Sequence, residues 1–415
     1  MNETQKRILI LGSLDEFCQL VQMARKRNLY TIVCDVNTKG PAKKLAHQSL
    51  DIDVREIDKI ADICRIKRVD YIVTSFSDLL FECMVKIADK ASLPCYMTPS
   101  QLPYYRDKAV MKRTLATLNI PTPKNLLLEE GFDSTALTSL KFPVVTKPLD
   151  LYGSRGVFVI DNPSQVRTYF DKVIKNYGVT KLLLEEYNEG LEFNMMTWVL
   201  DGEIQVLSIA DREKSPAAED EVPYGSRNVY PSAKMDEVYD DAKDILARYI
   251  AKTGQSNGPL SMQFFYSPKE GLQVGEIAGR FFGYEHELLE YCSGLSIEQL
   301  LLDSLENPQQ LKTALKNHNP FFKTVSAVLY FQAHDGIIAA QTDTLSNFCA
   351  THVKKFQLFY NVGEPIAMPG SHPYAARIYV NADSRTEIDD ISEQIINELS
   401  ITDKDGRELL FRNKL

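Results

Sequence analysis

The amino-acid sequence predicts a mixed α/β (α+β) protein whose first part is a doubly wound parallel sheet. Strand-like and helix-like segments alternate over residues 1 to about 100, the pattern of parallel strands covered by helices on both faces. Residues 258–283, GPLSMQFFYSPKEGLQVGEIAGRFFG, show a second pattern, two strand-like runs joined by a short turn. At 415 residues and 44% hydrophobic residues, the chain is long enough to form two to four lobes.

The elements of the first region follow from apolar runs separated by turn residues. The expected strands are Ile8–Leu11, Tyr30–Asp35, Tyr71–Ser75 and Cys95–Met97, and the expected helices are Leu14–Asn28, Ile57–Ile66 and Leu79–Ala91. A dinucleotide site needs three glycines after the first strand, and Gly12 stands alone in LGSLDEF, so we reject NAD binding. The strand ends at Gly12, Asp35 and 75–78 could still border a small-molecule pocket, or Asp78 could serve only as a helix N-cap.

Composition and charge exclude several classes of protein. The net charge is −9 and the 47 basic residues form no stripe, so we expect no nucleic-acid partner. The start of the chain has no signal-peptide pattern and no apolar run approaches a membrane span of about 20 residues, so we expect a cytoplasmic protein without a membrane partner. The seven cysteines form no Cys-x-x-Cys pair, and the six histidines lack zinc spacing.

Basic residues and glycines in the next region suggest an anion site. Residues 106–108, Arg-Asp-Lys, open a helix that runs to about Leu118, and lysine is disfavoured at a helix start unless it meets an anion. Lys147 lies in a short strand, 142–148, and the loop 153–157, Gly-Ser-Arg-Gly-Val, follows it and leads into a strand up to Ile160. Backbone N–H groups of such a loop can close over phosphate oxygens, although a Gly-x-x-Gly turn is weak evidence and Lys108 could simply be solvated.

Acidic residues gather at the end of a buried strand. The strand 181–187, KLLLEEY, ends in Glu185 and Glu186, and Glu192 lies near the start of the next strand, which runs to Leu200. The turn Asp201-Gly202 returns the chain along 203–209. One of these acids could accept a hydrogen bond from a base amino group, and another from the hydroxyls of a ribose.

The hairpin of residues 258–283 carries a polar pair on one face. If its turn closes on Ser267 and Leu272, the opposed pairs are Phe265 with Val274, Gln263 with Glu276, and Ser261 with Ala278. Directly opposed Cβ atoms lie about 5 Å apart, so Gln263 and Glu276 can converge on one hard cation, which takes its other ligands from substrate phosphates. The alternative is a half-exposed hairpin with a hydrated polar face.

The order of these motifs resembles the ATP-grasp superfamily. The motifs are Asp107-Lys108, Lys147 in Val-Thr-Lys-Pro, the 153–157 loop, Glu185-Glu186-Tyr187 with Glu192, and Gln263 with Glu276-x-x-x-Arg280. The superfamily includes D-alanine ligase, biotin carboxylase, carbamoyl-phosphate synthetase and the L-amino-acid ligases, and the resemblance covers residues 1 to about 300. It implies four regions: a pre-ATP-grasp Rossmann-like domain (1–105), a small lobe with a glycine-loop lid (106–188), a large lobe with the metal hairpin (189–310) and a C-terminal lobe packed on the large lobe (311–415).

The resemblance also assigns roles to residues, with ATP and Mg²⁺ (or Mn²⁺) as cofactors. Lys108 and Lys147 would contact the α and β phosphates, the adenine would lie on Glu185 and on the backbone of Glu186, Tyr187 and Asn188, the ribose on Glu192, and the lid would be Gly153, Ser154, Arg155, Gly156 and Val157. The catalytic pair would be Arg280, which stabilises developing charge, and Glu276, which holds the metal with help from Gln263.

The implied activity is that of an ADP-forming ligase for small molecules. A carboxylate attacks ATP to give an acyl phosphate, and an amine then displaces the phosphate. Two departures from the family pattern bear on this reaction: Gln263 replaces the usual acid, and Ala278 stands where an asparagine ligand is usual. Two alternatives stay open, namely a bicarbonate-using enzyme that transfers a carboxy or carbamoyl group, and a non-catalytic nucleotide-binding protein. The sequence leaves the oligomeric state open, with a homodimer as one option.

The rest of the chain is less informative. Residues 211–232 are polar and expected to be irregular, and Arg212, Lys214 and Arg227 there could hold a substrate carboxylate or be merely solvated. His286 could touch substrate or start a helix. A helix is expected over 235–253 and another up to Leu305; strands are expected over 326–332, 336–342, 352–356 and 375–381, a turn at His372, and a last helix over 385–399.

Overall fold

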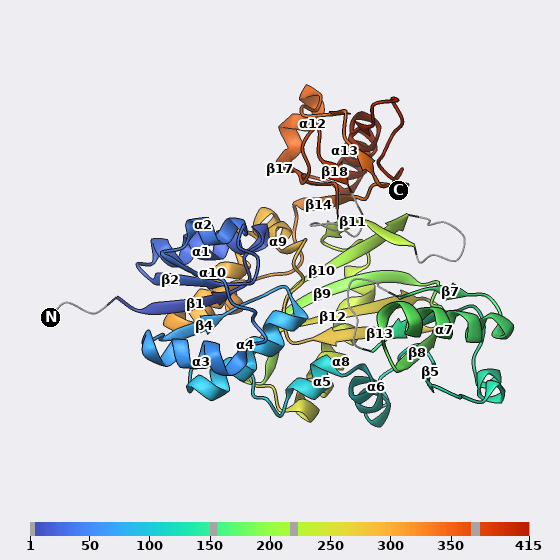
Figure 1. The fold of residues 1–415 in the computed structure, drawn as a ribbon, viewed down its shortest axis with the longest axis horizontal. Coiled ribbons are helices and arrows are strands. Elements are labelled where there is room, and N and C mark those ends of the chain that lie inside the picture. The colour runs from blue at the N-terminus through green and yellow to red at the C-terminus, as the bar shows by residue number, and fades with distance from the viewer. Residues whose placement is uncertain (1–4, 150–155, 216–222, 367–373, 415) are drawn as a thin grey trace.

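The computed structural model describes residues 5–149, 156–215, 223–366 and 374–414 and contains three large β-sheets. A parallel sheet of four strands lies at the N-terminal end, a four-stranded antiparallel sheet lies at the opposite end of the molecule, and an eight-stranded antiparallel sheet lies between them (Figure 1). Among the described residues, no helix is long and apolar enough to cross a membrane.

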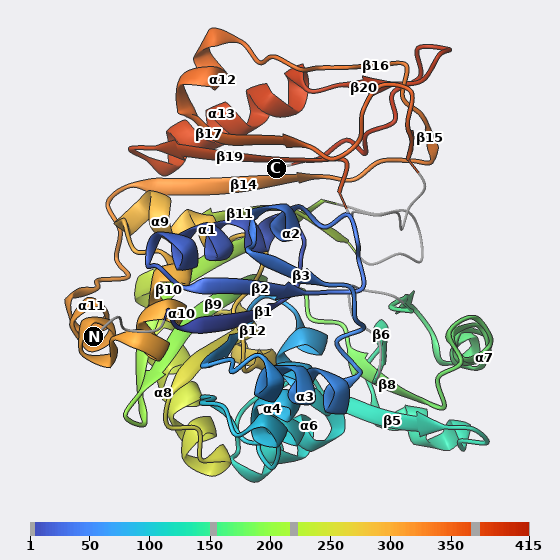
Figure 2. The same ribbon diagram turned by 60° about the vertical axis from the view of Figure 1, so that its left-hand side comes forward.

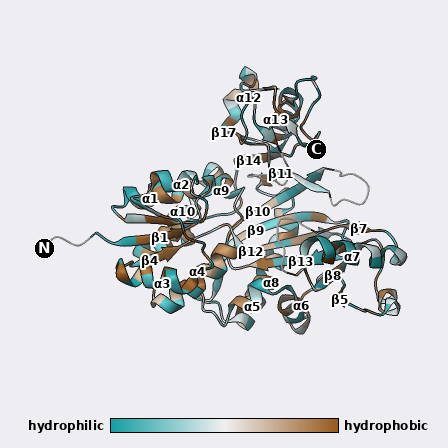
Figure 3. Cartoon of the chain, in the orientation of Figure 1, coloured by the Kyte–Doolittle hydropathy of each residue, from teal (hydrophilic) through white to brown (hydrophobic). Residues whose placement is uncertain are grey.

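The N-terminal sheet has the predicted doubly wound form. Its strand order is β3 (Gln48–Leu50), β2 (Tyr30–Cys34), β1 (Arg7–Leu11) and β4 (Tyr71–Val73), all paired in parallel. Helices α1 (Cys18–Lys26) and α2 (Pro41–Leu45) lie on one face, and α3 (Ile57–Ile66) and α4 (Asp78–Ala91) lie on the other (Figure 1). Hydrophobic residues concentrate along β1 and β4, whereas α1 and α2 carry hydrophilic residues on their outer sides (Figure 3).

One predicted strand of this sheet was wrong. Cys95–Met97 forms no strand, and the sheet is completed instead by β3 (Gln48–Leu50), which was not predicted. The Tyr96 hydroxyl instead donates to the carbonyl of Gly279 at 3.0 Å, and a Cβ at Gly258 would lie 2.4 Å from the Tyr96 ring. Met97 is buried in the core shared with the large sheet, and Cys95 and Tyr96 pack against that core while partly exposed.

The small sheet has its own hydrophobic core. Its order is β5 (Asn125–Glu129), β8 (Lys181–Glu186), β6 (Val144–Pro148) and β7 (Val159–Ile160), and helix α7 (Val166–Tyr177) covers it. Helices α5 (Leu102–Arg106) and α6 (Lys108–Thr117) connect it to the N-terminal sheet. Arg106 therefore ends one helix and does not open the next, which is capped by the Asp107 carboxylate.

The large sheet joins the middle of the chain to its C-terminal part. Its order is β13 (Gly271–Ala278), β12 (Gly258–Ser267), β9 (Leu191–Leu200), β10 (Glu203–Ser215), β11 (Tyr224–Tyr230), β14 (Val325–Phe331), β19 (Ala376–Ala382) and β17 (Val353–Leu358). Figure 2 shows β14, β19 and β17 continuing the sheet beyond β11. The division of the chain into four lobes stays a prediction, and the last of them shares this sheet with the third.

The prediction of irregular structure over 211–232 was wrong for most of that segment. Strand β10 continues to Ser215, and β11 returns antiparallel to it with Asp211 opposite Val229. The remaining helices are α8 (Met235–Thr253), α9 (His286–Ser293), α10 (Ile297–Glu306), α11 (Pro308–Asn317), α12 (Asn347–His352) and α13 (Arg385–Glu398). The short strands are β15 (Gly336–Ile337), β16 (Ala340–Gln341), β18 (Pro365–Ile366) and β20 (Ile401–Thr402), and the short 3₁₀ turns are Asp15–Phe17, Ser134–Ser139 and Pro163–Gln165.

The hairpin β12–β13 has two of the three predicted pairs. Gln263 is opposite Glu276 and Ser261 is opposite Ala278, but Phe265 is opposite Gln273 and not Val274. The turn closes on Ser267 and Gly271, one residue earlier than expected, and a β-bulge at Gly275 restores the register further along.

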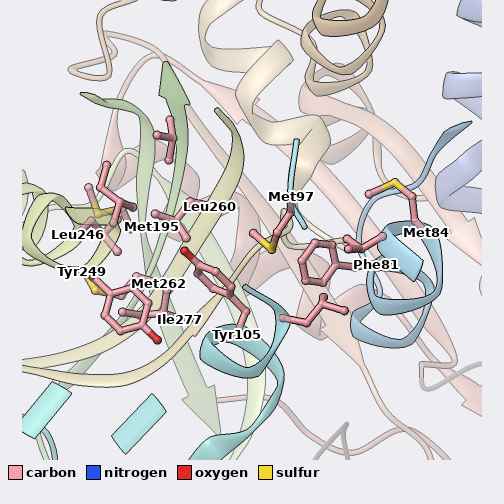
Figure 4. Close-up of a cluster of buried hydrophobic side chains, with 14 of the residues drawn as sticks. Phe81, Met84, Met97, Tyr105, Met195, Leu246, Tyr249, Leu260, Met262 and Ile277 are labelled. Carbon is pink, nitrogen blue, oxygen red and sulfur yellow. The ribbon is translucent and has the colours of Figure 1, made fainter. Parts of the chain in front are cut away.

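The N-terminal sheet and the large sheet share one hydrophobic core. Phe81 and Met84 of α4, together with Met97, pack toward Leu260, Met262 and Ile277 of the large sheet, and Leu246 and Tyr249 of α8 close the cluster (Figure 4). Burial of this apolar surface holds the start of α4 close to the end of the hairpin β12–β13.

Candidate functional site

A cavity of about 780 Å³ lies between the small sheet, the large sheet and the N-terminal region. It brings together most of the site residues expected from the sequence: Lys108, Lys147, Val157, Glu185, Glu186, Tyr187, Asn188, Glu192, Gln263, Glu276 and Arg280 all line it. Gly156 does not line it, although a Cβ at Gly156 would lie 2.8 Å from Pro148, which does. Gly153, Ser154 and Arg155 lie outside the described residues. Of the strand ends considered earlier, Asp78 lines the cavity, whereas Gly12 and Asp35 do not.

Two lysines meet the carboxylate of Glu185, and one of them, Lys147, lines the cavity. Lys147 of β6 and Lys112 of α6 both pair with it, the latter at 2.7 Å, and the Glu185 side chain is 1% exposed. Burial alone would raise the pKa of Glu185, but the charges of Lys112 and Lys147 lower it to about 2. The carboxylate is therefore ionised at neutral pH and holds both ammonium groups in place.

Lys112 is a functional candidate that the sequence reasoning missed. It lies four residues after Lys108 and so on the same face of α6, which is a signal that could have identified it. Its Nζ also donates to Thr122 Oγ1 at 2.5 Å and to the carbonyl of Gly275 at 3.3 Å. Lys112 thus connects Glu185 of the small sheet to the bulge of the hairpin β12–β13. Lys108 itself donates to the carbonyl of Pro148 at 2.8 Å.

Glu192 of β9 is the second buried carboxylate of the cavity. Arg212 pairs with it at 2.5 Å, Lys214 also pairs with it, and the amide of Gln263 donates to it. Burial would raise the pKa of Glu192, but Arg212 and Lys214 lower it below its usual value. Two of the three basic residues of segment 211–232 therefore lie in the cavity.

The residues present fit a magnesium ion that takes most of its ligands from phosphates. Glu276 faces the cavity, and none of the described residues forms an ion pair or hydrogen bond with its carboxylate, so its oxygens are available. The amide of Gln263 donates its N–H to Glu192, which leaves its oxygen for a cation. Over the described residues, no cluster of three His, Cys, Asp or Glu could hold a metal alone. Ala278 faces Ser261, which does not line the cavity and supplies no substitute ligand there.

Arg280 is anchored by a residue from the N-terminal region. Its Nη2 lies 2.6 Å from Asp78 Oδ2 and its Nε donates to Asp78 Oδ1 at 3.0 Å. Asp78 is the first residue of α4, and Ser77, not Asp78, is the N-cap of that helix. Arg106, whose Nη1 lies 3.8 Å from Asp78, also lines this end of the cavity.

Three other candidates lie elsewhere or are not described. Arg227 is 3% exposed and pairs with Glu213 and Asp389, both at 2.7 Å. It lines a neighbouring cavity of about 1070 Å³, which shares Glu192, Arg212 and Lys214 with the first cavity. His286 does not line the nucleotide-sized cavity: it is buried, and Glu298 Oε1 lies 3.0 Å from its Nε2. Burial would lower the pKa of His286, but Glu287 and Glu298 raise it to about 9. His372 lies outside the described residues.

The carboxyl of Glu285 is buried near Arg212, and it was not expected from the sequence. Glu285 is 1% exposed and accepts hydrogen bonds from Asn194 Nδ2, at 3.1 and 3.2 Å, and from Asn228. Burial raises the pKa of Glu285 from its usual 4.5 to about 7.

This raised pKa predicts a pH-dependent stability. The folded protein holds the proton of Glu285 more tightly than the unfolded chain does. The contribution of this proton to the free energy of unfolding is therefore fully present below pH 4.5 and is lost as the pH rises to 7. Glu285→Gln stays neutral, and we expect it to melt at a higher temperature than the wild type above pH 7. Thermal unfolding of both proteins at pH 5, 6, 7 and 8 checks this; a constant difference between their melting temperatures would contradict it.

Comparison with known proteins identifies the class. Residues 140–286 match the family model of the ATP-grasp domain, which agrees with the resemblance that the order of the motifs gave. This match contains three of the four strands of the small sheet (β6, β7 and β8), the hairpin β12–β13 and Arg280.

Particular relatives agree with this class. The chain is similar to a formate-dependent phosphoribosylglycinamide formyltransferase from Prochlorococcus marinus subsp. pastoris, with 25% identity over 199 residues, 46% of this chain and 50% of that protein. The chain spans about half the length of the curated relatives it matches. Among solved structures, an L-amino acid ligase from Bacillus licheniformis superimposes with a TM-score of 0.79 at 17% identity, over 97% of this chain and 100% of that one.

A further solved structure is the biotin carboxylase domain of 2-oxoglutarate carboxylase from Hydrogenobacter thermophilus, in complex with MgADP, ADP and bicarbonate. It superimposes with a TM-score of 0.74 at 15% identity, over 98% of this chain and 92% of that one. The predicted fold, an ATP-grasp fold preceded by a doubly wound parallel sheet, is confirmed by these superpositions.

Proposed function

We propose that this protein is an ATP- and magnesium-dependent ligase that joins a small carboxylate to an amine and releases ADP and phosphate. The observation that carries the proposal is the grouping of Lys108, Lys147, Glu276 and Arg280 around one cavity, the last three within the residues that match the ATP-grasp domain. Carboxylate activation by ATP passes through an acyl phosphate, which an amine then attacks. A cavity of about 780 Å³ has the size of a small-molecule site and not of a macromolecular interface.

The positions of the cations support phosphate binding. Lys108 and Lys147 reach the cavity from α6 and β6, and Lys147 is held by Glu185. Burial would lower the pKa of Lys147, but Glu185 raises it above its usual value, so this lysine stays charged. Fixed positive charge beside the transferred phosphoryl group stabilises phosphoryl transfer electrostatically.

The other end of the cavity supports a nucleoside site. Glu186, Tyr187, Asn188 and Glu192 line this end of the cavity. The proposal assigns the adenine to the segment 186–188 and the ribose to Glu192, whose carboxylate can accept hydrogen bonds from hydroxyl groups. An ionised carboxylate has about four lone-pair sites, so Glu185 retains acceptor capacity for the adenine amino group beside its two lysines.

Magnesium fits the proposal through Glu276, with the amide oxygen of Gln263 as a second ligand. When bound, the ion supplies charge neutralisation for the polyphosphate. The protein supplies orientation and exclusion of water around the reacting groups. The complex of the Hydrogenobacter domain with MgADP supports the same cofactor pair here.

Two further candidates remain within this class. The bicarbonate in the Hydrogenobacter complex favours a bicarbonate-using variant, and the name of the Prochlorococcus relative favours formate, itself a carboxylate, as the acid. Loss of the metal ligand at Ala278 leaves room for a non-catalytic nucleotide-binding protein.

Release of ADP from ATP separates these candidates. The purified protein is incubated with MgATP and a panel of carboxylates, formate included, each with and without an amine, and in parallel with bicarbonate. Stimulation that requires a carboxylate, with the amine incorporated into product, supports the ligase. Stimulation by bicarbonate supports the variant, and binding of MgATP without ADP release under any condition supports the non-catalytic protein.

A further inference from the structure

Arg280 is fixed in direction by a side chain outside its own hairpin. The two bonds to Asp78, of 2.6 and 3.0 Å, use parallel donors of the guanidinium and both oxygens of the carboxylate. Both side chains are 13% exposed, so water screens the pair only weakly. A two-point, charge-assisted contact fixes the orientation of an arginine as well as its position.

The backbone before Asp78 is held in an unusual conformation. Phe76 has a φ of +72°, in the left-handed region that a bulky side chain rarely adopts. Its ring stacks on the buried ring of His286 at a centroid distance of 4.3 Å. A Cβ at Gly283 would lie 2.9 Å from the Cβ of Phe76, so the close approach of the two segments requires glycine there. Strained backbone of this kind persists where the surrounding packing determines it, and it gathers at functional sites.

Glu276 is a second carboxylate of the cavity that could attract the Arg280 guanidinium. Glu276 lies four residues before Arg280, borders the same cavity, and has no partner among the described residues. Its charge contributes to raising the pKa of Arg280, although Asp78 contributes more after the opposing effect of burial. Glu276 is the one carboxylate lining this cavity that has no ion pair or hydrogen bond among the described residues. Without Asp78, we expect the guanidinium to turn toward Glu276 and to neutralise a group that the metal needs.

We propose that Asp78 is a positioning residue, which aims the Arg280 guanidinium at the transferred phosphoryl group and keeps it away from Glu276. The inference rests on the proposed function. It means that the N-terminal region, through the turn at 75–78, controls the charge stabilisation supplied by the metal hairpin. The Phe76–His286 stack and the Glu298 contact to His286 brace this turn against α10.

The test combines Asp78 variants with a variant of Arg280. In Asp78→Asn, which keeps size and loses charge, kcat for ADP release is expected to fall about tenfold to a hundredfold, while the Kd of MgADP changes by less than about twofold. Asp78→Glu, which keeps the charge, should recover most of the rate. In an Arg280→Lys background, Asp78→Asn should cause little further loss, because the partner that it orients is already gone.

A matched control uses a second ion pair made by the N-terminal region. Arg27 pairs with Asp303 of α10 at 2.6 Å, and neither residue lines the cavity. Arg27→Gln should lower the melting temperature and leave kcat close to the wild-type value, which separates positioning from loosening of the fold.

Each result decides for or against the inference. Independent, additive losses in the double variant overturn it, as does a raised KM for the amine or the acid with unchanged kcat, which would place Asp78 on substrate. Failure of the wild type to bind MgADP or to release ADP would contradict the proposed function itself. An active wild type whose rate is insensitive to Asp78→Asn would contradict only the positioning role.

Discussion

Replacement of Glu276 by glutamine is expected to lower the rate of ADP release by about a hundredfold or more. The substitution keeps the volume of the side chain. It removes the one carboxylate lining the cavity that has no ion pair or hydrogen bond among the described residues. A neutral amide binds magnesium far more weakly than a carboxylate, and Gln263 already supplies one amide oxygen at this face. Calorimetry should show that ADP binding loses its magnesium dependence.

The matched control for this variant lies on the same hairpin. Glu270 is exposed at the turn between β12 and β13 and does not line the cavity, so Glu270→Gln should leave both rate and affinity unchanged. If Glu276→Gln bound MgADP and turned over as the wild type does, the assignment of the metal to this hairpin would have to be abandoned.

Replacement of Glu185 by glutamine is expected to destabilise the protein by about 3 kcal/mol at pH 7. The variant leaves Lys112 and Lys147 without their shared counter-charge, and Lys112 is 7% exposed. Because the pKa of Glu185 is lowered to about 2, its contribution is present above the usual value of 4.5 and is lost as the pH falls toward 2. The stability difference between wild type and variant should therefore shrink across that acid range.

Denaturant unfolding at pH 7 and at several pH values below 4.5 measures this difference. Glu129→Gln is the control, since Glu129 pairs with Lys181 in the same sheet with both side chains about half exposed. Exposed pairs contribute little to stability. Equal losses in the two variants would show that the buried lysine pair has no special dependence on Glu185.

The fold was largely predictable wherever one apolar pattern covered a whole element. Helices α3 and α8 have the bounds that their periodicity predicts. The prediction ended strand β10 at residue 209, six residues before its end in the structure. Asp211 and Glu213 face one side of the strand, and Arg212 and Lys214 face the other. Ion pairs therefore replace the apolar alternation by which a strand is predicted.

The sequence predicted which residues line the site better than it predicted which side chains contact one another there. The motif order brought Lys147, Glu192 and Glu276 to one cavity, but no local pattern shows that Lys112 contacts Glu185, 73 residues away in sequence, or that Asp78 contacts Arg280. Such contacts depend on how separate lobes dock, which a periodicity within one element does not encode. The hairpin register failed at Gly275 for a related reason, since a bulge inserts one residue without changing the composition.

The place of β14 in the large sheet has a consequence for any shortened form of this protein. Strand β11 hydrogen-bonds to β10 on one side and to β14 on the other. A polypeptide that stops before Val325 would leave the backbone amides and carbonyls of β11 open to solvent, and a bare strand edge recruits other chains. The last quarter of the sequence therefore covers an edge of the large sheet, and we expect a polypeptide that lacks it to aggregate.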